Sequence, residues 1–208
     1  MVQQCSMASL KATVTSRASA IERIIHPEAE HIINNFYERR NATMADMLVI
    51  LRGMPGSGKT TLARFMKLYA RSIGHSVRVC SADDFFEGAH GYVFVSQLLP
   101  QAHRQCWERF ENALHEVDVV IIDNTNIAQR EWEPYERYAR DQNYDRAWDI
   151  EYDSIDIVKV QFECQDLREA YRLNHRGKRI EDRTIENRFV VFQRDNEHYE
   201  PDVSIHPQ

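Results

Sequence analysis

One run of eight residues has the types and spacing needed to hold phosphate groups. It reads Gly-Met-Pro-Gly-Ser-Gly-Lys-Thr over residues 53–60 and satisfies the pattern G-x-x-x-x-G-K-[ST] in full. Its glycines let backbone N–H groups point at phosphate oxygens, Lys59 supplies a charge for the β- and γ-phosphates, and the Thr60 hydroxyl can join the coordination of Mg²⁺. A glycine-rich turn without a ligand is the alternative. We expect ATP and Mg²⁺ to bind here, through Gly53, Pro55, Gly56, Ser57, Gly58, Lys59, Thr60 and Thr61.

Three aspartates follow predicted strands at the edge of the sheet where that ligand would lie. Asp123 ends the apolar run Val119–Ile122, the place for an acid that holds the metal ion, although it also suits a turn or helix cap. Asp83 and Asp84 follow the short strand 77–80, and ligands of open parallel sheets gather at the carboxyl ends of strands. One of this pair could accept the proton of an attacking hydroxyl; the alternative is a solvated turn.

A basic stretch near the carboxyl end is the third candidate. Residues 168–183 hold six basic and three acidic side chains, a local charge of +3 in a chain of net charge −6. Arginines three or four residues apart can share one side of a helix. In phosphoryl transfer, arginines from a lid neutralise the transferring group, and the alternative is a solvated, salt-bridged face. The arginines in question are Arg172, Arg176, Arg179 and Arg183.

The segments between these candidates alternate between strand-length apolar runs and helical spacing. Such alternation predicts an α/β fold with three layers, in which helices cover both faces of a mainly parallel sheet. We expect an extra strand or a surface insertion over residues 145–155, and a central strand over 157–162. The remaining expected strands are 47–51, 77–80 and 117–122, and the expected helices follow Lys59, Pro100, Trp132 (with Pro134 in its first turn), Leu167 and Ile185.

Composition changes mark four sections of the chain. Residues 1–20 hold no acid and six serines or threonines, which predicts a disordered tail, with an organelle transit segment as the alternative. We expect residues 21–45 to form a helical extension, and apolar side chains within 21–40 are spaced to pack on the main domain or on a protein partner. We expect the main domain to cover 46–198 and a polar tail to cover 199–208.

The overall composition excludes several classes of protein. The chain has 208 residues, of which 43% are hydrophobic, so it is not mostly disordered. No apolar run approaches the roughly 20 residues that span a bilayer, so we expect no membrane helix. The acidic balance argues against coating duplex nucleic acid by bulk charge. Four well-separated cysteines favour the cytoplasm or another reducing compartment, with organelle import as an alternative.

The ordered set of motifs is similar to a known family. GMPGSGKT, SADDFF, IIDNTN with a Pro-Tyr about eight residues on, and finally Arg172-Leu-Asn-His-Arg176-Gly together resemble the kinase domain of bacteriophage polynucleotide 5′-hydroxyl kinase and the eukaryotic P-loop domains related to it. The resemblance covers about residues 47–195. It implies a P-loop NTPase sandwich with an arginine-bearing lid, Lys59 and Thr60 on ATP and Mg²⁺, Asp83 as general base, and Arg172 and Arg176 over the phosphates.

Two departures concern the acceptor. The phage-type enzyme has an arginine shortly after the aspartate pair, where this chain has Phe85-Phe86, and its acid before Thr-Asn falls at Asn124 here, with Asp123 one position earlier. Either phenylalanine could stack on a base or pack in the core. We expect transfer of the γ-phosphate to single-stranded RNA or DNA 5′ ends; the alternatives are a small-molecule kinase for a nucleoside or sugar, and a non-catalytic ATP-dependent binding module.

Overall fold

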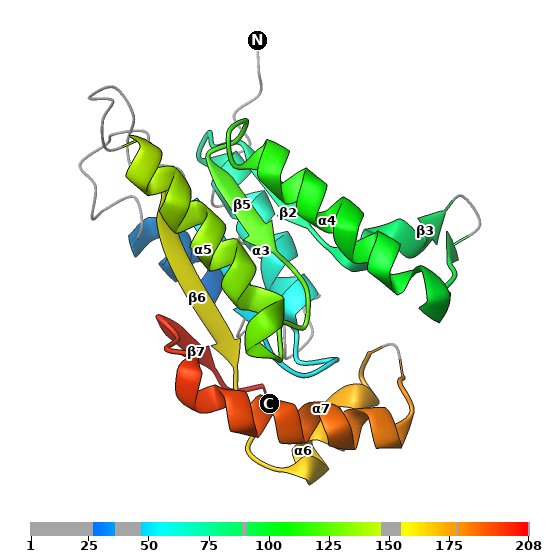
Figure 1. Cartoon of the computed structure of the whole chain (residues 1–208). Helices are drawn as coiled ribbons and strands as arrows, with labels where there is room; N and C mark the ends of the chain where they lie inside the picture. Colours follow the sequence, from blue (N-terminus) through cyan, green and yellow to red (C-terminus); the bar gives the residue numbers. More distant parts are fainter. Residues whose placement is uncertain (1–26, 36–46, 89–90, 147–154, 178, 208) are drawn as a thin grey trace.

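The computed structural model describes residues 27–35, 47–88, 91–146, 155–177 and 179–207 (Figure 1). Five strands form one sheet in the order β2-β5-β1-β6-β7, and every neighbouring pair is parallel. Helices cover both faces, which confirms the predicted P-loop α/β sandwich. The strands are β1 (Met47–Arg52), β2 (Val77–Cys80), β5 (Val119–Ile122), β6 (Asp156–Phe162) and β7 (Val203–Ile205); β3 (Glu87–Gly88) and β4 (Gly91–Tyr92) form a separate hairpin.

β1 is the middle strand of the sheet. All six of its residues are buried because β5 and β6 flank it and helices cover both of its faces. The sequence had suggested 157–162 as the central strand, but β6 lies one place further out. The first four residues of β6 are only half-buried, since the neighbour on its outer side, β7, is short.

Helix α3 (Lys59–Ser72) and residues 27–35, also helical, pack on one face of the sheet. Ala29, Ile32 and Ile33 are buried there among side chains of β1 and α3. The Tyr69 hydroxyl donates a hydrogen bond to Asn34 at 2.8 Å. These three apolar side chains of the N-terminal extension therefore pack on the domain itself, while residues 1–26 and 36–46 lie outside the described residues.

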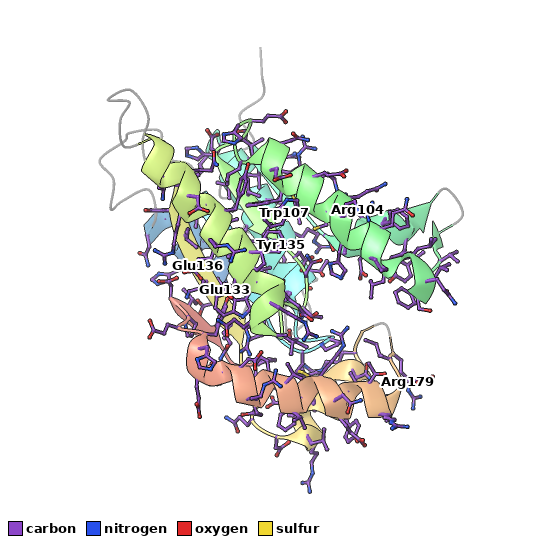
Figure 2. All side chains as sticks on the ribbon, in the orientation of Figure 1. Arg104, Trp107, Glu133, Tyr135, Glu136 and Arg179 are labelled. Carbon is purple, nitrogen blue, oxygen red and sulfur yellow. The ribbon has the colours of Figure 1, made fainter. Side chains whose placement is uncertain are left out.

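Helices α4 (Leu99–Ala113) and α5 (Gln129–Arg146) cover the opposite face. Aromatic rings join the two helices: the centroids of Trp107 and Tyr135 are 5.2 Å apart, and those of Phe110 and Tyr135 are 5.0 Å apart (Figure 2). Pro134 lies inside α5, one turn beyond the predicted position. The extra strand or insertion suggested for 145–155 falls almost wholly outside the described residues.

Helices α6 (Leu167–Asn174) and α7 (Asp182–Arg194) lie below the carboxyl ends of the strands in Figure 1. The basic stretch 168–183 is therefore not one helical face, as the sequence suggested, because it crosses a turn. The Asn174 side chain closes this turn by donating to the Ile180 carbonyl at 2.8 Å and accepting from its N–H at 3.0 Å. A small apolar cluster holds both helices against the domain; it includes Met54, Ile127, Leu173, Ile185 and Phe192.

The last ten residues, which we expected to be a tail, contribute a strand. β7 pairs in parallel with β6 from Val160 to Phe162. Tyr199 is buried and its hydroxyl donates to the Ile50 carbonyl of the middle strand at 3.1 Å. The remaining short turns are η1 (Ala82–Phe86), η2 (Ser96–Leu98) and η3 (Asp195–His198). Within the described ranges, no helix is long and apolar enough to cross a bilayer.

Candidate active site

The phosphate loop, residues 53–58, joins β1 to α3 through glycines in the left-handed region. Gly56 has φ 78° and Gly58, which caps α3, has φ 108°, conformations that a side chain disfavours. α3 therefore begins at Lys59 with the unpaired N–H groups of its first turn facing the loop. All eight residues predicted to contact the nucleotide lie in this loop or this turn: Gly53, Pro55, Gly56, Ser57, Gly58, Lys59, Thr60 and Thr61.

Lys59 lies across the loop and is buried. Its Nζ donates to the carbonyls of Gly53 at 2.8 Å and Met54 at 2.9 Å, and to Ser57 Oγ at 3.2 Å. Burial lowers the pKa of Lys59 to about 8, and the carboxylate of Asp123 partly opposes this shift. An anion in the loop would stabilise the charged ammonium, so the site favours phosphate over a neutral ligand.

Thr60 and Asp123 bring two oxygen ligands together beside this lysine. Asp123 follows β5, is 7% exposed, and accepts a hydrogen bond from the Thr60 side chain. Burial raises the pKa of Asp123, against the opposing effects of Thr60 and the Lys59 charge. No group of three or more His, Cys, Asp or Glu side chains that could hold a metal occurs in the described part of the chain. The pair fits Mg²⁺, which proteins often hold by few side chains together with substrate phosphates.

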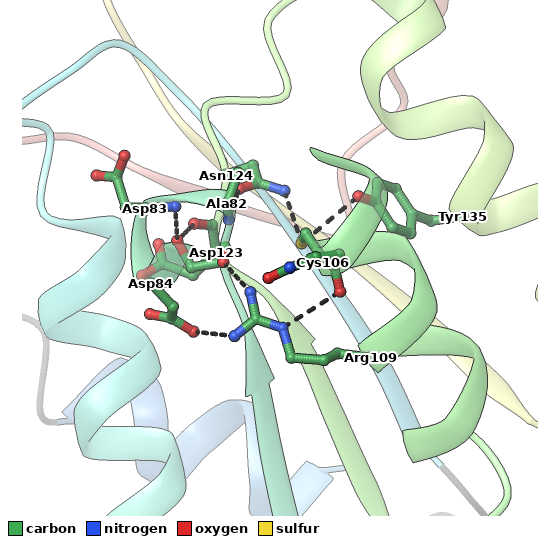
Figure 3. Close-up of polar contacts among 10 residues, drawn as sticks. Ala82, Asp83, Asp84, Cys106, Arg109, Asp123, Asn124 and Tyr135 are labelled. Carbon is green, nitrogen blue, oxygen red and sulfur yellow. Dashed lines mark hydrogen bonds and ion pairs between the residues drawn. The ribbon is translucent and has the colours of Figure 1, made fainter. Parts of the chain in front are cut away.

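The three residues after Asp123 connect the ends of the neighbouring strands. Asn124 Oδ1 accepts the Ala82 N–H at 2.9 Å, which fixes the start of η1 (Figure 3). The Thr125 carbonyl accepts the N–H of Gly53 at 3.0 Å, and Asn126 donates to the Leu51 carbonyl at 2.7 Å. Asn124 thus positions the turn that carries the aspartate pair.

The two aspartates of η1 have different partners. Asp84 forms an ion pair with Arg109 at 2.9 Å, and Arg109 also donates to the Ser81 carbonyl at 2.7 Å (Figure 3). Asp83 accepts a hydrogen bond from the Tyr92 hydroxyl at 3.2 Å and is exposed. The charge of Asp83 acts on the pKa of both Lys59 and Asp123, and that of Asp84 acts on the pKa of Asp123, so the pair lies near the phosphate loop. The chain therefore brings together Lys59, Thr60, Asp123 and Asp83, as their positions after three strands predicted.

Two arginines have partners that the sequence did not indicate. Arg172 donates to Glu169 at 3.2 Å and to the Pro207 carbonyl at 3.1 Å, contacts that direct it to the carboxyl-terminal segment. Arg188, which sequence reasoning missed, donates from α7 to Thr125 Oγ1 at 3.0 Å, and its charge lowers the pKa of Lys59. A signal for it existed: Arg188 lies three residues after buried Ile185 and four before buried Phe192, so it shares their face of α7.

The backbone of the α6–α7 pair (residues 167–194) lies directly on the phosphate loop. A Cβ placed on Gly56 would meet the Leu173 carbonyl oxygen at 1.9 Å, and one placed on Gly177 would lie 3.2 Å from the Gly56 Cα. Arg176 lies in this stretch, and its N–H donates to the Leu173 carbonyl at 3.0 Å. The turn after α6 is therefore in contact with the loop that the nucleotide would occupy, whereas the roles of Arg172 and Arg176 stay predictions.

Comparison with known proteins agrees with this geometry. A family model described as "AAA domain" (AAA_33) matches residues 48–187, more than half of the chain. The chain belongs to this family. It is a P-loop kinase domain by fold, with the nucleotide-binding loop that the resemblance to polynucleotide kinases implied.

Individual relatives cover parts of the domain. Human NEDD4-binding protein 2 is 31% identical over 113 residues, which are 54% of this chain and 6% of that protein. The structure of a Pnkp1/Rnl/Hen1 RNA repair complex has a TM-score of 0.53 at 21% identity and covers 78% of this chain and 49% of that one. Kti12 from Chaetomium thermophilum, solved with ADP-AlF3, has a TM-score of 0.48 at 19% identity, over 76% of this chain and 87% of that one. The P-loop kinase domain thus spans a small fraction of its human relative.

Proposed function

We propose that this domain transfers the γ-phosphate of ATP to the 5′-hydroxyl of a polynucleotide. The observation that carries the proposal is the position of Asp83, an exposed carboxylate whose charge acts on the phosphate-loop lysine and on the buried Asp123. A carboxylate beside bound phosphate has little to contribute to phosphate binding, since like charges repel. It does have a role if a hydroxyl must lose a proton there.

In the proposed reaction, the acceptor oxygen attacks the γ-phosphorus while the bond from that phosphorus to the β–γ bridging oxygen breaks. The hydroxyl proton passes to the Asp83 carboxylate, and ADP leaves with the electron pair of the broken bond. The Tyr92 hydroxyl, whose pKa burial raises to about 12, stays protonated at neutral pH and orients Asp83 by donating to it. Lys59 and Arg188 stabilise the negative charge on the transferring group.

Thr60 and Asp123 would hold Mg²⁺ together with the nucleotide. When bound, the ion neutralises negative charge on the phosphate oxygens. The protein's own part is to keep Asp123 buried and close to Thr60, which maintains an oxygen ligand pair at the carboxyl edge of β5.

Support for a polynucleotide acceptor comes from two further features. The ordered motifs resemble polynucleotide 5′-hydroxyl kinases, and a protein of an RNA repair complex shares the fold. Asp83 and Asp84 both lie exposed on η1, so a long acceptor could reach the general base without entering a closed cavity.

The test is transfer of labelled γ-phosphate from ATP with Mg²⁺. The acceptors are 5′-hydroxyl RNA, 5′-hydroxyl DNA of the same sequence, and a nucleoside and sugar mixture, with Lys59→Ala as the blank. We expect label on an oligonucleotide, and none with the blank. Label only on a nucleoside or sugar would favour a small-molecule kinase, and nucleotide binding without transfer would favour an ATP-dependent binding module.

Asp84→Asn is a matched control for Asp83→Asn. Both aspartates are exposed on the same turn, but Asp84 is held by Arg109. Asp83→Asn should lower the transfer rate by about 100-fold or more and leave ATP affinity nearly intact, whereas Asp84→Asn should retain most of the rate. If the two variants exchange these phenotypes, Asp84 is the base and the assignment of Asp83 is wrong.

A further inference from the structure

An exposed apolar segment lies immediately after the hairpin β3–β4. Of the seven large apolar side chains that are exposed among the described residues, four lie within six positions: Val93, Phe94, Val95 and Leu98. Phe94 is 52% exposed and Val93 is 64% exposed. Single exposed apolar side chains need no explanation, but a contiguous group of them marks a binding surface.

The ring of Phe94 is held in place from beneath. It packs on the buried ring of Phe86 with centroids 5.0 Å apart, and the Val93 N–H donates to the Phe86 carbonyl at 2.9 Å. Phe86 also contacts Tyr92, with centroids 6.1 Å apart. A half-exposed aromatic ring on a buried aromatic support is a rigid flat surface, which costs little entropy when a planar ligand stacks on it.

This surface is continuous with the acceptor side of the site. Tyr92 and Phe94 both pack on the Phe86 ring, with centroids 6.1 Å and 5.0 Å from it, and the Tyr92 hydroxyl donates to Asp83. Phe94 lies two residues after Tyr92, which is at most about 7 Å along the chain, a distance comparable to one nucleotide. An acceptor whose hydroxyl reaches Asp83 would therefore place its next atoms over the Phe94 ring.

We propose that Phe94, supported by Phe86, is the stacking surface for the first unpaired base at the 5′ end of the acceptor. This assignment rests on the proposed kinase function and names how its substrate is held. Aromatic stacking is tolerant of base sequence, as an enzyme for unspecified 5′ ends requires. It also replaces recognition by an arginine immediately after the aspartate pair in the sequence, where this chain has Phe85-Phe86.

The experiment compares two 5′-hydroxyl oligonucleotides, one intact and one with an abasic first nucleotide, as substrates of the full chain. The variants are Phe94→Ala, Phe94→Trp, which retains a ring, and Leu68→Ala, which removes a side chain of matched 53% exposure on α3. Phe94→Ala should raise the KM for the intact oligonucleotide about 5- to 100-fold and leave the KM for ATP unchanged. Phe94→Trp and Leu68→Ala should stay within about twofold of the parent protein.

The abasic substrate gives the decisive comparison. With the abasic substrate, the KM of the parent protein should rise by about the same factor by which Phe94→Ala raises the KM for the intact substrate. The Phe94→Ala variant should have about the same KM for both substrates. If the parent protein phosphorylates both substrates equally well, or if Phe94→Ala still prefers the intact one, the stacking assignment is wrong while the kinase function stands. If no oligonucleotide is phosphorylated, the kinase function and the stacking surface fall together, and the apolar segment is left for a protein partner.

Discussion

Substitution of Gly56 tests whether the turn after α6 must lie on the phosphate loop. The Cβ of Gly56→Ala would meet the Leu173 carbonyl oxygen at 1.9 Å, about 1.5 Å short of the 3.4 Å at which ordinary contact begins. Leu173 cannot yield easily, because its side chain is fully buried among Met54, Ile185 and Phe192. Either the loop or the α6–α7 pair must therefore move by more than 1 Å.

The expected magnitude follows from that displacement. A misplacement of about 1 Å at a reacting centre costs about 100-fold in rate, and we expect a loss of this size in γ-phosphate transfer by Gly56→Ala. Overpacking should lower the free energy of unfolding by about 1–3 kcal/mol. The left-handed φ of 78° adds about 1–2 kcal/mol to that loss.

Two other glycines separate the clash from the backbone strain. Gly74→Ala places a Cβ at φ 100° with no atom within 4 Å, so it should cost the strain alone and leave nucleotide affinity and transfer rate within about twofold. Gly177→Ala approaches the same contact from the other side at 3.2 Å, so a shift of a few tenths of an ångström should suffice and the loss of rate should be small.

Thermal unfolding, titration with ATP and single-turnover transfer on the three variants measure these effects. The order of transfer rates should be Gly74→Ala, then Gly177→Ala, then Gly56→Ala. If Gly56→Ala binds nucleotide and transfers phosphate as well as Gly74→Ala, the contact between the turn and the loop is not part of the working conformation, and the reasoning fails.

Three further predictions concern buried or partly buried cations. Lys59 has a pKa of about 8 and ATP binds its charged form, so the Kd for ATP should rise about tenfold between pH 7 and pH 9. Binding should take up a proton, which calorimetry in buffers of different ionisation enthalpy measures. A Kd that does not change with pH would contradict this pKa. Arg188→Gln should slow transfer about 10- to 100-fold. It should also shift the rise in the Kd for ATP to higher pH, because it removes a charge that lowers the pKa of Lys59. If the Kd for ATP rises at the same pH as in the parent protein, Arg188 does not act on the lysine. Arg52→Met should lower the free energy of unfolding by about 3–5 kcal/mol in urea denaturation, because four oxygen acceptors would lose the hydrogen bonds that the buried guanidinium donates. A loss below about 1 kcal/mol would mean that the desolvation cost of Arg52 cancels the contribution of these hydrogen bonds.

The parts of the fold that sequence predicted share one property: their signal is local. β1, the phosphate loop and α3 form one continuous pattern of an apolar run, a motif and helical spacing, so their order and bounds follow from residues 47–72 alone. β7 has only three residues and lacks any periodicity to recognise, because its register depends on the β6 edge that it joins. The turn between α6 and α7 interrupts the basic stretch although the spacing of its arginines suits one helix, because the Asn174 side chain closes it through hydrogen bonds to Ile180 that no local pattern indicates.

The residues of the candidate site also divide into those with a local sequence signal and those whose contacts depend on distant segments. Asp83 and Asp123 were placed correctly at strand ends, because parallel topology brings those ends to one edge. The partners of the arginines depend on packing between segments far apart in the chain. Arg172 is drawn to Pro207, a contact 35 residues away, and Arg188 to Thr125, 63 residues away. A count of basic residues shows where charge accumulates, and it carries no information about which of them turns toward the phosphates.

The segment Asp123–Asn126 explains why the pieces of this site should behave as one unit. Asn124 fixes the turn of Asp83, Thr125 bonds both the first glycine of the loop and Arg188, and Asn126 bonds the end of β1. Because Thr125 bridges the loop and α7 through separate backbone and side-chain atoms, Thr125→Val keeps the carbonyl contact with Gly53 and removes only the hydroxyl that positions Arg188. The effects of Thr125→Val and Arg188→Gln on transfer should therefore overlap rather than add, whereas two unconnected contributions would multiply in rate.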